Sequence, residues 1–322
     1  MRASTPPNPW VGCVLVAPDG QTFEGATEPV GGRHAELVAL HAAGGAARGS
    51  TAYVTLEPCA HHGRTPPCTD ALLAVGVARV VVGVVDPDPH VAGRGIELLR
   101  AAGVTVDVAE GEPAFATAES LAPYLVHRRT GRPYVVLKSA ASLDGRTAAP
   151  DGSSQWITGV EARTDAHRLR AESDVVIVGA GTVAVDDPSL TVRLVAAPRG
   201  DPRRVVLGTI PEGAKVVPAE EHHGDLGELL DRLGSEGAVQ VLVEGGASVA
   251  HAFHVAGLVD RYVLYLAPVL FGGDDARGMF AGAGAPGTAD AWRGRITAVV
   301  PFGADLRVDV APITDETSVT SG

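Results

Sequence analysis

The sequence predicts an α/β protein of two domains, and three observations lead to this prediction. The chain has 322 residues, about twice a typical domain of roughly 150 residues. Short β-branched runs alternate with helical segments, which is typical of a parallel or mixed sheet with helices on its faces. A polar, turn-rich stretch at 127–133 interrupts this alternation. We place the domain boundary there, with one domain at 1–126 and another at 132–322.

The elements expected in the first domain follow one another in order. Two apolar runs, 11–16 and 21–26, flank Pro18-Asp19-Gly20 and are expected to form a β-hairpin. The other expected elements are strands at 51–56, 80–85 and 104–108 and helices at 34–43, 69–75, 93–102 and 115–125. The run 80–85 is almost entirely β-branched, which predicts a strand buried on both faces of the sheet.

The second domain is expected to be α/β as well, and rich in sheet. Its expected elements are strands at 135–137, 175–178, 205–207, 239–243, 262–267 and 306–310 and helices at 161–171, 226–233 and 248–256. The stretch 179–184 matches a loose G-x-G-x-x-A dinucleotide-binding fingerprint. Such a unit runs directly into a long helix, whereas Asp186-Asp187-Pro188 follows here, so we reject a Rossmann unit. The tail after Pro312 is expected to be disordered.

Composition and charge exclude several functions. The net charge of −12 leaves no basic field for a phosphate backbone, which argues against nucleic-acid binding. No apolar run approaches the ~18 residues of a membrane span, and residues 1–10 carry no apolar signal core. We therefore expect a soluble cytoplasmic protein. Three cysteines in a chain of this length do not make a disulfide framework, so they are buried small side chains or metal ligands.

The sharpest local signal is His34-Ala35-Glu36 followed by Pro58-Cys59 and then Cys68. One imidazole and two thiolates leave a zinc ion a fourth position for water, whose pKa the metal lowers to about 7. Glu36 is placed to take a proton from that water and pass it to a leaving amine. This H-x-E…P-C…C order is the signature of zinc-dependent nucleobase deaminases. Eight residues separate the two cysteines here, however, instead of two.

Two other interpretations of this pattern need weighing. The His-x-Glu pair could be a solvated helix face with the two cysteines buried and inert. Zinc could also be purely structural, in which case a fourth protein ligand would close the site, and His61 and His62 are candidates for it. The four elements occurring in order favour the catalytic site. Cys13 lies in the middle of an expected strand and is expected to be a core residue.

The longer motifs resemble those of the bifunctional riboflavin-biosynthesis deaminase–reductase family. In the first domain they are Pro7-Asn8-Pro9-Trp10-Val11-Gly12, Glu57-Pro58-Cys59-Ala60-His61-His62-Gly63-Arg64-Thr65-Pro66-Pro67-Cys68 and Asp86-Pro87-Asp88-Pro89-His90-Val91-Ala92-Gly93-Arg94-Gly95. In the second they are Lys138-Ser139-Ala140-Ala141-Ser142-Leu143-Asp144-Gly145, Ser154-Gln155-Trp156-Ile157-Thr158, Asp186-Asp187-Pro188-Ser189-Leu190-Thr191-Val192-Arg193 and Val243-Glu244-Gly245-Gly246. The long loop between the cysteines is itself a feature of this family. Relatives usually carry a helix before the first motif, and only residues 1–6 precede Pro7, so either the chain starts late or its deaminase half lacks that covering helix.

The resemblance implies a fold, two activities and a set of site residues. The first domain would have a cytidine-deaminase-like fold and the second a dihydrofolate-reductase-like fold. The chain would deaminate a diaminopyrimidinone that carries a ribosylamino 5′-phosphate, and then reduce the ribosyl group to ribityl with NADPH. By resemblance the zinc ligands are His34, Cys59 and Cys68 and the proton shuttle is Glu36. The substrate-binding positions would be Ser154, Arg170, Leu190, Arg193 and Glu244. The cofactor-binding positions would be Ala140, Trp156, Thr182, Asp186, Thr209, Gly246, Ala247, Ser248, Val249, Ala250, His251 and Ala252.

The chemistry of several reductase residues supports these assignments independently. Arg170 and Arg193 are suited to clamping a phosphate in bidentate fashion, although such arginines are more often in surface salt bridges. Glu244-Gly245-Gly246 follows an expected strand and opens a helix, which makes either an anion site for a cofactor pyrophosphate or a simple tight turn. Lys138 is expected at a strand end that faces the site, where it would contact the substrate near the reacting carbon.

Other functions were weighed against this one. A deaminase acting on tRNA is disfavoured by the negative charge, and one acting on a free base is disfavoured by the motifs of the second domain. A zinc-containing nucleotide sensor, or a deaminase whose second domain binds without reducing, would also fit parts of the sequence. A sensor has no need of a carboxylate such as Glu36 beside an open zinc position. The sequence leaves open the oligomeric state and whether the intermediate is channelled.

Overall fold

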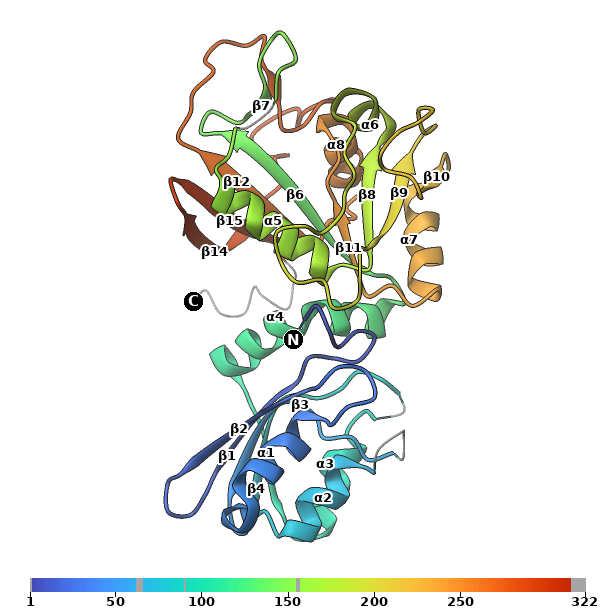
Figure 1. The fold of residues 1–322 in the computed structure, drawn as a ribbon. Helices are drawn as coiled ribbons and strands as arrows, with labels where there is room; N and C mark the ends of the chain where they lie inside the picture. The colour runs from blue at the N-terminus through green and yellow to red at the C-terminus, as the bar shows by residue number, and fades with distance from the viewer. Residues whose placement is uncertain (1, 62–65, 90, 155–156, 314–322) are drawn as a thin grey trace. The chain divides into compact units, whose positions relative to one another are not determined.

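The computed structural model describes residues 2–61, 66–89, 91–154 and 157–313. It divides the chain into two compact units, Met1–Arg132 and Pro133–Gly322 (Figure 1). None of the helices in these described ranges is long and apolar enough to cross a membrane. Each unit has a sheet and a core of its own.

The first unit is built on a five-stranded mixed sheet with the order β2-β1-β3-β4-β5. Its strands are β1 (Gly12–Val16), β2 (Thr22–Ala26), β3 (Thr51–Leu56), β4 (Arg79–Val84) and β5 (Thr105–Val108). Strand β1 pairs antiparallel with both β2 and β3, whereas β3, β4 and β5 run parallel. The structure therefore confirms the hairpin expected from the two runs around Pro18-Asp19-Gly20.

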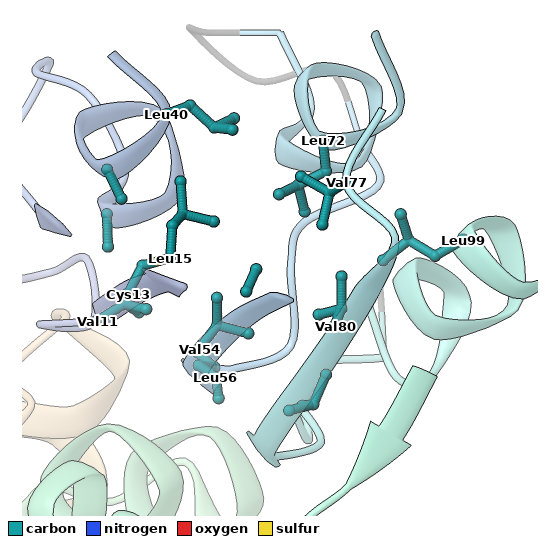
Figure 2. Packing of buried hydrophobic residues seen from close by; sticks show 14 of the residues in the cluster. Val11, Cys13, Leu15, Leu40, Val54, Leu56, Leu72, Val77, Val80 and Leu99 are labelled. Atoms are coloured by element: carbon teal, nitrogen blue, oxygen red, sulfur yellow. The ribbon is translucent and has the colours of Figure 1, made fainter. Parts of the chain in front are cut away.

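Helices cover one face of this sheet and close the core. They are α1 (Ala35–Ala43), α2 (Cys68–Val75) and α3 (Arg94–Ala101), with a short 3₁₀ turn, η1 (Gly44–Ala47), after α1. Figure 2 shows Leu15, Val54 and Val80 on neighbouring strands together with Leu72 of α2 and Leu99 of α3. Cys13 is buried in the same core, as expected, and burial raises the pKa of its thiol.

Two expectations for this unit were wrong. Strand β4 is fully buried on only one face, because Val81 and Gly83 are half-buried and line a groove on the other face of the sheet. The stretch expected to be turn-rich is mostly helix, since α4 (Gly111–Thr130) continues through it and ends at Gly131, which has a φ of 74°. Basic side chains in the last turn of a helix interact favourably with its dipole, which explains why the polar run 127–130 stays helical.

The second unit has an eight-stranded sheet with the order β10-β9-β8-β11-β6-β12-β15-β14. Its strands are β6 (Tyr134–Ser142), β8 (Val175–Gly179), β9 (Arg203–Leu207), β10 (Glu220–His222), β11 (Gln240–Val243), β12 (Arg261–Ala267), β14 (Gly294–Phe302) and β15 (Asp305–Pro312). The first six strands of this order, from β10 through β9, β8, β11 and β6 to β12, are parallel to one another. Strand β15 pairs antiparallel with β12, and β14 pairs antiparallel with β15 at the edge of the sheet. Strands β7 (Arg146–Ala148) and β13 (Arg277–Gly278) form a separate small sheet.

Helices pack on both faces of this second sheet, because successive residues of its central strands point to opposite faces. The helices are α5 (Val160–Glu172), α6 (Ala180–Asp186), α7 (Leu226–Ser235) and α8 (Ala247–Val255). Val175, Ile177, Val241 and Val243 share a core with α7 and α8. The intervening strand residues, Val176, Val178 and Leu242 among them, share a second core with α5 and α6.

Candidate functional sites

The three expected zinc ligands lie together in the first unit. His34 is the N-cap of α1, Cys68 is the first residue of α2, and Cys59 lies in the loop that follows β3. The Nδ1 atom of His34 is 3.6 Å from Sγ of Cys59 and 3.3 Å from Sγ of Cys68. The three ligand atoms all lie within 4.8 Å of one another. The structure thus brings together residues that are 34 positions apart in sequence.

This arrangement fits a tetrahedral zinc ion. Bonds of about 2.3 Å to sulfur and about 2.0 Å to nitrogen would separate a sulfur from a nitrogen ligand by about 3.6 Å. The backbone N–H of Cys68 donates to Sγ of Cys59 at 3.3 Å. Hydrogen bonds from Cys68 and His34 lower the pKa of the Cys59 thiol, which favours the thiolate that a metal requires. Among described residues, His34, Cys59 and Cys68 are the only such cluster of potential ligands.

Glu36 lies two residues after a ligand, in the first turn of α1. Its side chain is buried, yet it lines the same cavity as His34 and Cys59. Burial raises the pKa of Glu36 to about 6, from an ordinary value of 4.5. A carboxyl with a pKa near the working pH exchanges protons readily in both directions, which is what a proton shuttle requires.

The cavity beside these residues has a volume of about 470 Å³, within the range of small-molecule sites. Residues from all three first-domain motifs line it: Pro7, Asn8 and Pro9; Glu57, Cys59 and His61; Asp86, Asp88 and Val91. His61, one candidate for a fourth ligand, is exposed and is not part of the ligand cluster. His62, the other candidate, lies outside the described residues.

Sequence reasoning gave no role to Glu57, although it lies inside a motif. Its buried carboxylate accepts backbone N–H hydrogen bonds from Gly93 at 2.9 Å and from Gly95 at 2.8 Å. It thereby ties the loop that carries Cys59 to the beginning of α3. The position of the Glu57 carboxylate directly before Pro58-Cys59 could have indicated a role for it. Its hydrogen-bond partners, however, are 36 and 38 residues away in the sequence and could not be identified from spacing.

In the second unit, the structure joins three of the expected residues in a buried ion cluster. The guanidinium of Arg170 donates to both carboxylate oxygens of Glu244, at 2.5 and 3.0 Å. The ammonium of Lys138 lies 3.8 Å from the same carboxylate. Lys138 is in the middle of β6, not at a strand end as expected, because β6 continues to Ser142 by pairing with β12.

The loop 189–193 lies next to this ion cluster. Arg170 also donates to the backbone carbonyl of Thr191 at 3.2 Å, and Arg193 donates to the Thr191 hydroxyl at 2.7 Å. Leu190 is buried with a φ of 51°, an uncommon backbone conformation for leucine. His167 was missed by sequence reasoning, although it lies three residues before Arg170 on α5. Its Nδ1 accepts the backbone N–H of Arg193 at 3.0 Å.

The expected cofactor residues gather where the parallel strands β8, β9 and β11 end. Gly246 is the N-cap of α8, and its backbone N–H donates to Oγ1 of Thr182 at 3.1 Å. Ser154 donates to Asp186 at 3.5 Å. Gly246 and Ser248 are exposed, whereas Ala247 and Ala250 are buried. Trp156 lies outside the described residues. The remaining predicted positions, which these contacts do not involve, are Ala140, Thr209, Val249, His251 and Ala252.

Comparisons with known proteins match both units of the chain. Residues 1–84 match the cytidine and deoxycytidylate deaminase zinc-binding region, and residues 133–306 match the RibD C-terminal domain. The riboflavin biosynthesis protein RibD of Escherichia coli is 40% identical, with 95% of this chain and 94% of that protein covered. The RibD protein of Mycobacterium tuberculosis is 46% identical, with 85% and 82% covered.

Solved structures of RibD proteins are also similar to this chain over most of its length. Acinetobacter baumannii RibD in its form 1 has a TM-score of 0.84 and 40% identity, with 97% of this chain and 95% of that chain covered. A diaminohydroxyphosphoribosylaminopyrimidine deaminase/5-amino-6-(5-phosphoribosylamino)uracil reductase from Thermotoga maritima has a TM-score of 0.80 and 31% identity, with 97% and 94% covered. Both structures extend over both units of this chain.

Proposed function

This chain belongs to the RibD family of riboflavin biosynthesis proteins, and from that premise we propose which of its residues carry the two reactions. It is a bifunctional enzyme, a zinc-dependent deaminase joined to an NADPH-dependent reductase. Its substrates are those in the name of the Thermotoga protein: a diaminohydroxypyrimidine with a phosphoribosylamino group, and then the corresponding uracil. The observation that carries this assignment is the His34, Cys59 and Cys68 cluster beside Glu36 in one cavity.

In the deaminase unit, His34, Cys59 and Cys68 would hold the zinc ion, which supplies a Lewis acid that activates water. Glu36 takes a proton from the attacking water and delivers it to the amino group, which leaves as ammonia. The other proton of the water passes to the ring nitrogen as the ring carbon gains its carbonyl oxygen. Burial suits Glu36 to this role because a pKa of about 6 allows it to accept and release the proton near neutral pH.

In the reductase unit, the predicted cofactor positions around Thr182 and Gly246 would hold NADPH, which would supply the hydride for C1′ of the ring-opened sugar imine while the imine nitrogen gains a proton. We assign the substrate side to Ser154, Arg170, Leu190, Arg193 and Glu244. The 3.8 Å contact between the ammonium of Lys138 and Glu244 supports the proposal that Lys138 contacts the substrate near the reacting carbon. The glycine turn at Gly246 presents backbone N–H groups at the start of α8, where an anionic part of the cofactor is favoured.

The variant Glu36→Gln tests the division of labour between the two units. It keeps the shape of the side chain and removes the proton shuttle, so we expect ammonia release to fall by at least about 100-fold. Zinc content and NADPH oxidation with the deaminated product supplied are expected to stay at the wild-type level. Glu97→Gln, which changes an exposed glutamate on α3, is the matched control. Undiminished ammonia release by Glu36→Gln would refute this assignment.

A further inference from the structure

The loop 189–193 of the reductase unit has no regular secondary structure, so contacts from elsewhere hold its backbone. Two of these contacts come from one face of α5, where His167 and Arg170 are three positions apart. Nδ1 of His167 accepts the backbone N–H of Arg193 at 3.0 Å. Arg170 donates to the backbone carbonyl of Thr191 at 3.2 Å. Helix α5 therefore determines where the end of this loop lies.

The loop has a conformation that its own residues do not favour. Leu190 is 3% exposed and has a φ of 51°, in the left-handed region that leucine rarely occupies. The side chain of Arg193 is exposed, and its guanidinium donates to the hydroxyls of Ser189 and Thr191 within the same loop. The position of this guanidinium therefore follows the position of the loop backbone. A contact that fixes the backbone at Arg193 also fixes what the loop presents to a ligand.

His167 provides an acceptor that depends on the form of its ring. A backbone N–H can only donate, so Nδ1 is unprotonated and the neutral ring carries its proton on Nε2. The residue is only 6% exposed. Burial and, after it, the nearby charges of Arg170 and Arg193 lower the pKa of the ring to about 4. The ring is therefore neutral near neutral pH, and Nδ1 is available there as a hydrogen-bond acceptor.

We infer that His167 is a positioning residue of the reductase, which holds the loop 189–193 so that Leu190 and Arg193 are ready to bind the pyrimidine substrate. The inference rests on the proposed function, which places Leu190 and Arg193 on the substrate side, and it adds a residue that acts through the loop. Without this acceptor the N–H of Arg193 loses its partner, and the substrate has to order the loop as it binds. His167 therefore acts on the KM for the substrate rather than on hydride transfer.

The experiment measures NADPH oxidation with the deaminated product supplied as substrate. His167→Leu and His167→Phe both remove the acceptor, one with an aliphatic side chain and the other with a ring. In both we expect the KM for the pyrimidine to rise about 10-fold, with the KM for NADPH unchanged and kcat altered by less than about 3-fold. His167→Gln keeps an acceptor in its amide oxygen, so its KM for the pyrimidine should stay within about 3-fold of the wild-type value.

The control is Thr164→Val on the same helix. It removes a hydroxyl that donates to the carbonyl of Val160 at 2.8 Å and keeps the shape of the side chain. We expect kcat and both KM values of this variant to equal those of the wild type.

Trypsin gives a second measurement that does not depend on activity. The protease cleaves after arginine, and a released loop exposes the bond that follows Arg193. We expect trypsin to cut this bond faster in His167→Leu and His167→Phe than in the wild type or His167→Gln, with the fragments identified by mass spectrometry. A variant that fails to fold is instead cut throughout the second unit, and the other of the two variants then decides.

Several results would overturn the inference. One is an unchanged KM for the pyrimidine in His167→Leu and His167→Phe, and another is a KM in His167→Gln as high as theirs. Equal losses in kcat and in both KM values, or cutting throughout the unit in both variants, would show that His167 supports the whole unit rather than the loop. If the wild-type protein oxidises no NADPH with the deaminated product, the proposed function itself fails and the inference fails with it.

Discussion

Replacing Glu244 by glutamine removes the only carboxylate from the ion cluster with Arg170 and Lys138. The side chain of Glu244 is 7% exposed, that of Arg170 14% and that of Lys138 19%. Removing one partner of a buried pair costs about 3–5 kcal/mol because the remaining charge is left uncompensated. Here the two cations retain some solvent contact, which places the expected loss at the lower end. We expect Glu244→Gln to lower the free energy of unfolding by about 3 kcal/mol.

Thermal unfolding of the full chain measures this loss. For a unit of this size each kcal/mol shifts the midpoint by about 2–4 °C, so the transition of the second unit should fall by roughly 6–12 °C. Glu236→Gln is the control, because Glu236 also contacts two arginines, Arg203 at 2.7 Å and Arg232 at 3.0 Å, but on the surface. Exposed pairs contribute little, so its midpoint should not move. Equal midpoints for the two variants would refute the reasoning.

The pH dependence of this effect has a definite sign. Burial by itself would raise the pKa of Glu244, but Arg170 and Lys138 outweigh it and lower the pKa to about 2. A folded pKa below the ordinary 4.5 means that the stabilisation is fully present above pH 4.5 and is lost as the pH falls from 4.5 toward 2. The stability difference between wild type and Glu244→Gln should therefore be constant from neutral pH to about 5 and shrink below that.

Three further predictions concern the zinc loop, the metal and the reductase site. In Gly95→Ala the new Cβ would lie 2.1 Å from the carbonyl oxygen of Pro58, so we expect the loop that carries Cys59 to be displaced. Zinc binding, measured in a competition titration, should therefore be weaker. The control Gly45→Ala has open space around the new Cβ and should bind zinc like the wild type. Removal of zinc by a chelator should abolish ammonia release and leave NADPH oxidation with the deaminated product intact; loss of both would contradict the separation of the two sites. Burial, aided by nearby arginines, lowers the pKa of His167 to about 4, so the free energy of unfolding should fall as the pH drops from 6.5 toward 4. The variant His167→Gln has no titrating ring at this position. Chemical unfolding should therefore show a smaller decrease in its free energy of unfolding between pH 7 and 5 than in the wild type. An unchanged slope in that variant would show that the hydrogen bond to the Arg193 N–H does not depend on a neutral ring.

The sequence predicted most elements because their apolar pattern matches their burial. It failed where tertiary pairing overrides local preference. Residues 139–142 are small or polar and gave no strand signal, yet they extend β6 because β12 pairs with them along its whole length. Strand β14 was not predicted, since none of its residues is buried and Pro301 falls within it, which is compatible with a strand at the sheet edge.

The zinc site was predictable because its ligands occur in short motifs at characteristic positions. The contacts between site residues far apart in the sequence were not predictable. Arg170 and Glu244 are 74 positions apart, and only the parallel sheet shows that they form an ion pair rather than two separate contacts to a ligand. Tyr124 lies inside the helix expected at 115–125 and Arg128 lies beyond its end, and the place of both residues in the deaminase cavity came only from the structure.

The central claim is that one chain carries out both reactions in order. The most direct test supplies the zinc-loaded protein with the phosphorylated diaminopyrimidine and NADPH and follows ammonia release and NADPH oxidation in the same sample. We predict equal amounts of both products, with no NADPH oxidation when deamination is prevented by Glu36→Gln. Ammonia release without NADPH oxidation would contradict the claim and would leave a deaminase whose second unit binds its ligand without reducing it.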